Sequence, residues 1–397
     1  MKKNLILAVL YLSCFAYSQS GKFRRMATIG FYNVENLWDT IASADYIDGT
    51  LSPDNPKFHR SISVDSIKYL PHEPYSGEWS DSKLKGKKVV RYQAFNDEFT
   101  PNSSKRYTTE LYHKKLQNSA KVISELGASI TKSPPVIVGL LEVENRQVVE
   151  DLTQQTPLKS YDYGVIHFNS YDFRGIDPAI IYQKRRFSPT YATHKELKLY
   201  KEDGKREYTR DLLVISGYLD GEKVAIFLNH WPSRRGGEAI SLPKRNAAAA
   251  LLRKQMDSVR AVEPNTKLIA MGDFNDDPVS SSIKDYLKAV GKPKQLSHEY
   301  PYLNLMYPLY KKGVASLAYR DAPNLFDQII VSENLVKNTD PYTYSVYTTI
   351  VYAPNYLINK EGNFKGYPFR SWDGDTFTGG YSDHFPVFTV LSKEVER

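Results

Sequence analysis

The chain of 397 residues has a single cysteine, Cys14. One cysteine cannot close a disulfide within the chain, so we expect a buried core rather than cross-links to hold the fold together. Long hydrophobic runs are also missing, because no stretch after the first residues is long and apolar enough to be transmembrane. The hydrophobic share of 41% and the charged share of 25% are ordinary for a folded globular protein.

The N-terminus has the parts of an export signal. Two lysines precede the short apolar run Leu5–Leu12, and Ala16-Tyr17-Ser18 has small residues spaced for cleavage before Gln19. We therefore expect residues 1–18 to be a signal peptide and the mature protein to be secreted or periplasmic. The alternatives are a lipoprotein anchored at Cys14 and a buried N-terminal helix.

Short apolar segments rich in β-branched residues recur along the rest of the chain, a pattern typical of β-strands. Helical periodicity is confined to three segments, and two long stretches lack either rhythm and are expected to be surface insertions. Many strands with few helices predict one domain, residues 22–397, in which sheets pack on each other under a cover of helices. The predicted strands are 28–34, 136–143, 163–168, 179–182, 212–217, 224–229, 267–271, 326–331, 347–352 and 385–391; the helices are 108–126, 244–262 and 280–290; the insertions are 41–105 and 353–381.

The strongest polar cluster is Gly272-Asp273-Phe274-Asn275, where an apolar strand runs into oxygen-bearing side chains. Such oxygens suit a hard cation or an attacking water. The alternative is a turn whose Asp and Asn side chains bond to their own backbone. An EF-hand loop is excluded, because Pro278 stands where that loop needs glycine.

Other polar residues stand at the ends or edges of predicted strands. Asp383-His384 enters an apolar strand, and histidine is suited to proton transfer near neutral pH. Glu142 ends a fully apolar strand, where a buried charge must be paired or bind a metal unless the strand end is exposed. Asn33 ends the first strand, and Asp327 lies inside another apolar strand.

A sixth cluster, Asn229-His230 followed by Arg234-Arg235 and two glycines, suits contact with phosphate through guanidinium and backbone N–H groups. The net charge of +8 favours a polyanionic partner, although it is equally compatible with a role in solubility alone. Strand ends at one rim of a sheet sandwich converge in space. The six clusters can therefore build one site.

Taken in order, these motifs resemble the endonuclease/exonuclease/phosphatase superfamily, and GDFN and SDHFP are the most specific of them. The resemblance implies an α/β fold, a four-layer α/β sandwich with two packed mixed β-sheets and the active site at one rim. It also implies roles for particular residues. The implied metal ligands, for Mg²⁺ with Mn²⁺ or Ca²⁺ as the other candidates, are Asn33, Glu142 and Asp383; the implied catalytic residues are Asp273, Asn275, Asp327, His384 and His230.

Further residues complete the expected site. The acidic partner of His230 is taken to be Asp177, with Asp172 as the second candidate, and the substrate phosphates are expected to meet Asn229, Arg174, Arg234 and Arg235. The implied function is metal-dependent hydrolysis of phosphodiester bonds by an extracellular or periplasmic nuclease of low specificity, acting as a monomer on nucleic acid with no stable protein partner. A phosphatase or phospholipase C-like enzyme acting on inositol phosphates or sphingolipids is the alternative, followed by a non-catalytic binding module.

Overall fold

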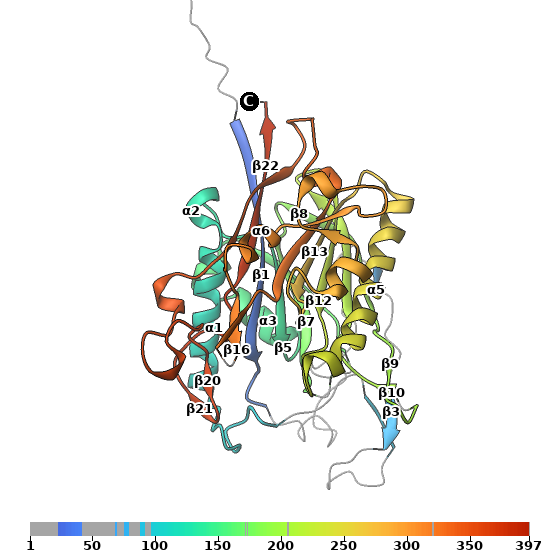
Figure 1. Ribbon diagram of the computed structural model, residues 1–397. Helices are drawn as coiled ribbons and strands as arrows, with labels where there is room; N and C mark the ends of the chain where they lie inside the picture. Colours follow the sequence, from blue (N-terminus) through green and yellow to red (C-terminus); the bar gives the residue numbers. More distant parts are fainter. Residues whose placement is uncertain are drawn as a thin grey trace, which may run out of the picture.

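The computed structural model describes residues 23–41, 68–69, 75–78, 88–91, 97–170, 172, 174–204, 206–319 and 321–396. The expected signal peptide, Cys14 and most of the expected insertion 41–105 lie outside the described residues. In the described part of the chain, two large sheets pack face to face, a six-stranded sheet A and an eight-stranded sheet B (Figure 1).

Sheet A has the strand order β19-β22-β1-β5-β7-β6. It is mixed, because β1 runs parallel to β5 but antiparallel to β22. Its strands are β1 (Phe23–Leu37), β5 (Ile137–Val143), β6 (Tyr163–His167), β7 (Asp177–Gln183), β19 (Ser345–Val351) and β22 (Val387–Val395).

Sheet B has the strand order β14-β15-β18-β13-β12-β11-β8-β2. It is also mixed, with β12 parallel to β13 and β13 antiparallel to β18. Its strands are β2 (Lys68–Tyr69), β8 (Phe187–Lys195), β11 (Leu212–Leu219), β12 (Glu222–His230), β13 (Lys267–Asp273), β14 (Ala289–Val290), β15 (Tyr302–Asn304) and β18 (Asp327–Ser332). Small hairpins pair β3 (Tyr75–Glu78) with β4 (Lys88–Arg91), β9 (Leu199–Tyr200) with β10 (Arg206–Glu207), β16 (Leu317–Tyr319) with β17 (Ala322–Asn324), and β20 (Trp372–Asp373) with β21 (Thr376–Phe377).

Helices cover the outer face of each sheet. Leu116 and Ile123 of the long helix nearest β1 pack with outward-facing residues of β1 and β5, while Leu252 and Met256 pack against sheet B. The helices are α1 (Thr109–Glu125), α2 (Ala128–Thr131), α3 (Arg146–Thr153), α4 (Thr156–Lys159), α5 (Glu238–Val262) and α6 (Tyr307–Tyr310). Figure 1 shows α1 and α5 on opposite sides of the sheets. These are the four layers of the expected α/β sandwich, which is confirmed.

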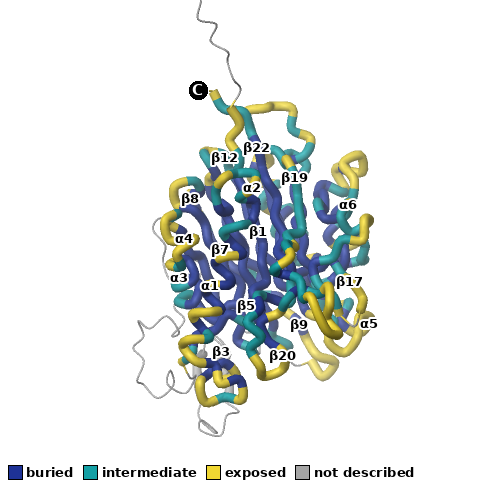
Figure 2. Tube along the Cα trace, turned by 90° about the vertical axis from the view of Figure 1, so that its left-hand side faces the viewer, coloured by how far each residue is buried: buried dark blue, intermediate teal, exposed yellow. Residues whose placement is uncertain are grey.

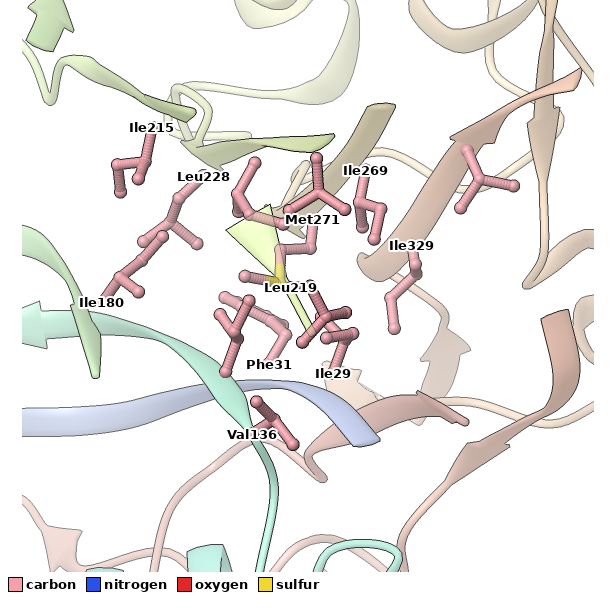
Figure 3. Close-up of a cluster of buried hydrophobic side chains, with 14 of the residues drawn as sticks. Ile29, Phe31, Val136, Ile180, Ile215, Leu219, Leu228, Ile269, Met271 and Ile329 are labelled. Carbon is pink, nitrogen blue, oxygen red and sulfur yellow. The ribbon is translucent and has the colours of Figure 1, made fainter. Parts of the chain in front are cut away.

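The central core lies between the two sheets. Alternate residues of each strand face inward, so Ile29 and Phe31 of β1 meet Leu228 and Met271 of sheet B in one buried cluster (Figure 3). Figure 2 shows burial concentrated in the strands and exposure in the loops. In the described chain, none of the helices combines the length and apolar character that a membrane span requires.

Several elements differ from the sequence prediction. The expected helix 280–290 is a short π-helix, Ser282–Tyr286, followed by the strand β14, and the helix α3 was not predicted. The strand β8, which pairs with β11, was not predicted because Ser188, Pro189 and Thr190 interrupt its apolar pattern. Helix α5 begins at Glu238 rather than after Pro243, so Pro243 lies inside the helix.

Candidate active site

The carboxylate of Asp273 lies at the centre of the rim where β12, β13 and β18 meet. The register pairs Asp273 with His230 on one side and with Asp327 on the other, so the sheet itself brings three predicted residues together. Gly272 makes this approach possible. Its φ is +152°, and a Cβ atom there would lie 2.0 Å from the backbone oxygen of Asn229. A side chain at this position would push β13 away from β12.

His384 reaches the same carboxylate from sheet A. Its Nδ1 lies 2.8 Å from Oδ2 of Asp327, and its Nε2 lies 4.0 Å from Oδ2 of Asp273. The loop that carries it is fixed by Ser382, whose hydroxyl accepts a hydrogen bond from the backbone N–H of His384 and donates one to the backbone oxygen of Asn33. The site is therefore assembled across both sheets.

His230 approaches Asp273 from the other side, with Nε2 3.7 Å from the same oxygen, Oδ2. Two buried histidines thus flank one carboxylate oxygen, but they have opposite charge preferences. Burial lowers the pKa of His230 well below its ordinary value, and the nearby charge of Arg210 adds to the effect. Burial also disfavours charge on His384, but Asp327 outweighs it and raises the pKa of His384 well above its ordinary value. At neutral pH His230 is neutral and His384 is an imidazolium.

The carboxyl group of Asp273 is buried, and this burial raises its pKa to about 7, against the opposing effect of His384. The backbone N–H of Asn275 donates to Oδ1 of Asp273 at 2.9 Å, which fixes the carboxylate. The Asn275 amide itself donates to the backbone oxygen of Trp231 at 3.0 Å. A carboxylate that titrates near neutral pH, fixed in place, is suited to take a proton from water.

Glu142 ends β5 in an uncommon backbone conformation, with φ +64°. Leu141, the residue before Glu142, pairs with Asn33 of β1. Arg174 binds both carboxylate oxygens of Glu142, with Nη1 to Oε1 at 3.1 Å and Nη2 to Oε2 at 2.8 Å. Burial alone would raise the pKa of Glu142, but the charge and hydrogen bonds of Arg174 lower it below its ordinary value. Glu142 is therefore ionised and bound to a cationic group.

The positive-φ residues indicate where the backbone is strained. Of the ten non-glycine residues in the described chain with positive φ, four belong to this rim, at the ends of three different strands. Such conformations persist where the surrounding structure over-determines them, and they gather at functional sites. The four are Glu35, Asn36, Glu142 and Asn275.

A second arginine–glutamate pair, which the sequence analysis missed, borders Asp383. Arg370 contacts Glu35 at 3.1 Å and Asp383 at 3.5 Å. Burial raises the pKa of Glu35 to about 7, and the charge of Asp383 adds to this. The amine of Lys115, on α1, donates to the hydroxyl of Ser371 and to the backbone oxygen of Tyr381, so the segment 353–381 is held against α1. The sequence around Glu35 gave no indication that this glutamate would contact Arg370, which lies 335 positions later in the chain.

The other predicted residues have local partners. Asn229 donates to the backbone oxygen of Phe227 and accepts from the Trp231 indole, which holds the end of β12. Arg234 pairs with Asp276 at 3.3 Å and Glu238 at 3.0 Å and donates to the backbone oxygen of Asn275 at 3.0 Å. Arg235 is exposed nearby. Arg234 thus braces the Asn275 turn.

The expected partner of His230 is wrong. Asp177 accepts hydrogen bonds from the backbone and hydroxyl of Ser170, both at 2.7 Å, and lies 3.2 Å from Nε2 of His167. Asp177 is therefore engaged by Ser170 and His167, and within the described residues Nδ1 of His230 has no hydrogen-bond partner. The second candidate, Asp172, pairs with Arg210 at 2.8 Å. The carboxylate beside His230 is Asp273.

The candidate metal ligands fit a hard cation by donor type. Asn33, Glu142 and Asp383 offer amide and carboxylate oxygens, and Glu142 already binds a cationic group, the guanidinium of Arg174. In the described part of the chain, no three His, Cys, Asp or Glu side chains form a group that could hold a metal ion as they stand. Arg174 binds both oxygens of Glu142, so it would compete with a metal ion for this carboxylate.

The sequence model of the Endonuclease/Exonuclease/phosphatase family matches residues 91–393, which include this rim from Glu142 to His384. The chain belongs to that family. Its members hydrolyse phosphate esters, and the assembled carboxylates and histidines are the groups that such chemistry uses. A comparison with curated proteins found no match.

Solved structures to which the chain is similar include two from Bacteroides thetaiotaomicron and one from Danio rerio. An endonuclease/exonuclease/phosphatase family protein of B. thetaiotaomicron has a TM-score of 0.47 at 14% identity, over 95% of this chain and 98% of that one. A mannosyl-6-phosphatase of the same organism has a TM-score of 0.47 at 14% identity, over 92% and 99%. D. rerio TDP2, in complex with a single-strand DNA product, has a TM-score of 0.45 at 16% identity, over 70% and 92%.

Proposed function

We propose that this chain is a metal-dependent phosphodiesterase that cleaves nucleic acid with little sequence preference. The observation that carries the proposal is the placement of two histidines of opposite protonation state around Oδ2 of Asp273. Asp273, which titrates near neutral pH, supplies a base. The cationic His384 and the neutral His230 supply two hydrogen-bond donors to a phosphate.

The roles follow from the protonation states. Asp273, once deprotonated, accepts the proton of a water that attacks the phosphorus in line. His384, held cationic by Asp327, donates from Nε2 to an oxygen of the phosphate as negative charge builds up there. His230 is neutral, so its Nε2–H can donate to a second phosphate oxygen without adding a full charge. Asn275 keeps Asp273 in position through its backbone N–H.

A divalent cation, Mg²⁺ in our proposal, would be held by Glu142 with Asn33 and Asp383 beside it. Bound there, it would supply neutralisation of charge on the scissile phosphate and on the leaving oxygen. Glu142 raises the pKa of Asp273, and the charge of His384 lowers that of Glu142. The proposed metal side and the proposed base side therefore belong to one electrostatic site.

Nucleic acid is the proposed substrate because the chain is basic. We propose little sequence preference because the sequence contains no base-reading motif. A net charge of +8 supplies attraction to a phosphate backbone that does not depend on sequence and weakens steeply with salt. The N-terminal segment supports the further proposal that the enzyme acts outside the cytoplasm, where polynucleotides are a source of phosphate. We also propose that it acts as a monomer.

The test is the initial rate of cleavage of mixed-sequence DNA and RNA with Mg²⁺ across a salt series. We expect cleavage at many positions and a rate that falls as salt rises. Sphingomyelin and inositol phosphates serve as the competing substrates in the same assay. Rapid turnover of either, with no cleavage of a polynucleotide at low salt, would assign the chain to the phosphatase or phospholipase class instead.

A further inference from the structure

The guanidinium of Arg174 donates hydrogen bonds to two side chains among the described rim residues, Glu142 and Asn36. Besides its two contacts with Glu142, its Nη2 donates to Oδ1 of Asn36 at 2.7 Å. Both carboxylate oxygens of Glu142 are engaged in a fork-to-fork arrangement, the geometry in which arginine binds carboxylates and phosphates most strongly. In this structure both carboxylate oxygens of Glu142 are therefore bound to a cationic group of the protein itself.

The backbone conformation of Glu142 indicates that its carboxylate has a role beyond a structural ion pair. Its φ of +64° interrupts the pairing of β5 with β7 between Leu141 and Val143. A bulky residue in this conformation costs on the order of 1–3 kcal/mol. Since an ordinary strand end could hold a glutamate on an arginine without this cost, the conformation is better explained by the position that it gives the carboxylate.

The exposure of Arg174 separates it from the buried pair of Arg245 and Asp276. Arg245 and Asp276 form a pair in which both side chains are fully buried. The side chain of Arg174, in contrast, is 36% exposed, and it lies on the connection between β6 and β7 rather than within a strand. Arg174 can leave Glu142 for solvent or for a ligand without opening the core.

We propose that Arg174 is a resident counter-ion that competes with the divalent cation for Glu142 and turns to the substrate phosphate when that cation binds. This rests on the proposed function, because it concerns the same site. Arg174 engages both oxygens of Glu142, so a metal ion at this carboxylate would compete with the guanidinium and be repelled by its like charge. A phosphate offers the released guanidinium the same bidentate geometry, so cation and phosphate should each strengthen the binding of the other.

The direct test is the affinity of the full mature chain for Mn²⁺ in the absence of substrate. It is measured from the decrease of the free-ion signal in electron paramagnetic resonance. Arg174→Gln should bind Mn²⁺ about tenfold more tightly than the parent, the scale of a charged hydrogen-bonded pair. Lys365→Gln removes one exposed positive charge that has no part in the proposed site and should leave the affinity within about twofold. Glu142→Gln should lose the tight site. Equal or weaker binding by Arg174→Gln would overturn the competition.

Two additions complete the test. If circular dichroism shows that Arg174→Gln does not fold, Arg174→Lys decides the question, because lysine keeps the charge but cannot bind both carboxylate oxygens as a fork. Tighter Mn²⁺ binding by Arg174→Lys supports the competition, and unchanged binding overturns it. Sulfate, a tetrahedral dianion, should tighten Mn²⁺ binding several-fold in the parent but not in Arg174→Gln. No effect of sulfate on the parent overturns the transfer of Arg174 to phosphate.

The outcome is separable from that of the proposed function. Tighter Mn²⁺ binding by Arg174→Gln in a protein that cleaves no phosphodiester supports the competition and overturns the function. Cleavage of DNA by a protein whose Mn²⁺ affinity does not respond to Arg174 does the reverse.

Discussion

Nδ1 of His384 lies 2.8 Å from Oδ2 of Asp327, although the two residues are 57 positions apart in the chain. Asp327 is fully buried at the start of β18, and His384 stands just before β22 in the other sheet. The contact therefore ties the two sheets together at the rim. It also fixes which nitrogen of His384 is turned to Asp273, and it makes His384 a cation at neutral pH.

Replacing Asp327 should change the pH dependence of the reaction as well as its rate. Asp327 raises the pKa of His384, so Asp327→Asn should lower that pKa. The reaction needs protonated His384, and the fall in rate at alkaline pH should then begin at a lower pH than in the parent. The measurement is the pH profile of kcat/KM on bis(p-nitrophenyl) phosphate. An unchanged alkaline limb, with only a lower plateau, would show that Asp327 acts by another route.

Asp273 should control the acid limb of the same profile. Its pKa is raised to about 7 by burial, and the proposed base must be deprotonated, so the rate should rise as pH increases through about 7. Asp273→Asn should lower turnover by at least about a hundredfold and remove this limb. Circular dichroism of the variant checks that the fold survives. A variant that keeps the acid limb would assign that limb to a different group.

Gly272 should be needed for the fold of the rim. A Cβ atom at Gly272 would lie 2.0 Å from the backbone oxygen of Asn229, so Gly272→Ala should lower the free energy of unfolding by at least about 2 kcal/mol. Gly221 is the matched control, because its φ is +88° and nothing lies within 4 Å of a Cβ there. Gly221→Ala should cost only about 1 kcal/mol. Urea unfolding compares the two, and equal losses would mean that the contact with Asn229 is relieved by a small shift.

The sequence predicted the parts of this site that depend on strand ends. Asp273 ends one apolar run and Asp327 lies within another, and the sheet register then makes them neighbours. The contacts of Glu35 and Arg174 could not be predicted in this way. Arg370 reaches Glu35 from the segment 353–381, and Arg174 reaches Glu142 from a connection, so neither contact leaves a periodic signal.

The error at Asp177 has the same origin. The sequence shows that an acid stands at a strand start, but it does not show which histidine that acid meets. Asp177 lies beside His167, at the end of the neighbouring strand β6, and not beside His230. The prediction of β8 failed for a different reason, since its exposed and buried residues alternate around Pro189 without a continuous apolar run.

His230 should act as a neutral hydrogen-bond donor. Burial keeps its pKa well below the ordinary value, so no limb of the pH profile should belong to it. His230→Gln retains an N–H donor and should lose less activity than His230→Ala, for which we expect a loss of about tenfold to a hundredfold. Turnover of both variants at pH 7 and pH 8 is the measurement. Equal losses, or a shifted limb in either variant, would contradict the neutral role.

Removal of divalent cations should abolish activity. The candidate ligands Asn33, Glu142 and Asp383 offer oxygen donors that suit Mg²⁺, Mn²⁺ or Ca²⁺ better than a closed zinc site. After exhaustive treatment with EDTA, turnover should disappear and return on addition of Mg²⁺. Full activity in EDTA would contradict the proposed dependence on a metal ion.

The most direct measurement of the central claim compares the parent chain with His384→Ala in the cleavage of mixed-sequence DNA at low salt with Mg²⁺. We predict cleavage by the parent and a rate at least about a hundredfold lower for a folded His384→Ala variant. The claim that this rim hydrolyses phosphodiesters would be contradicted by near-parental cleavage in that variant. It would equally be contradicted by a parent chain that releases phosphate from a small monoester but leaves DNA and RNA intact.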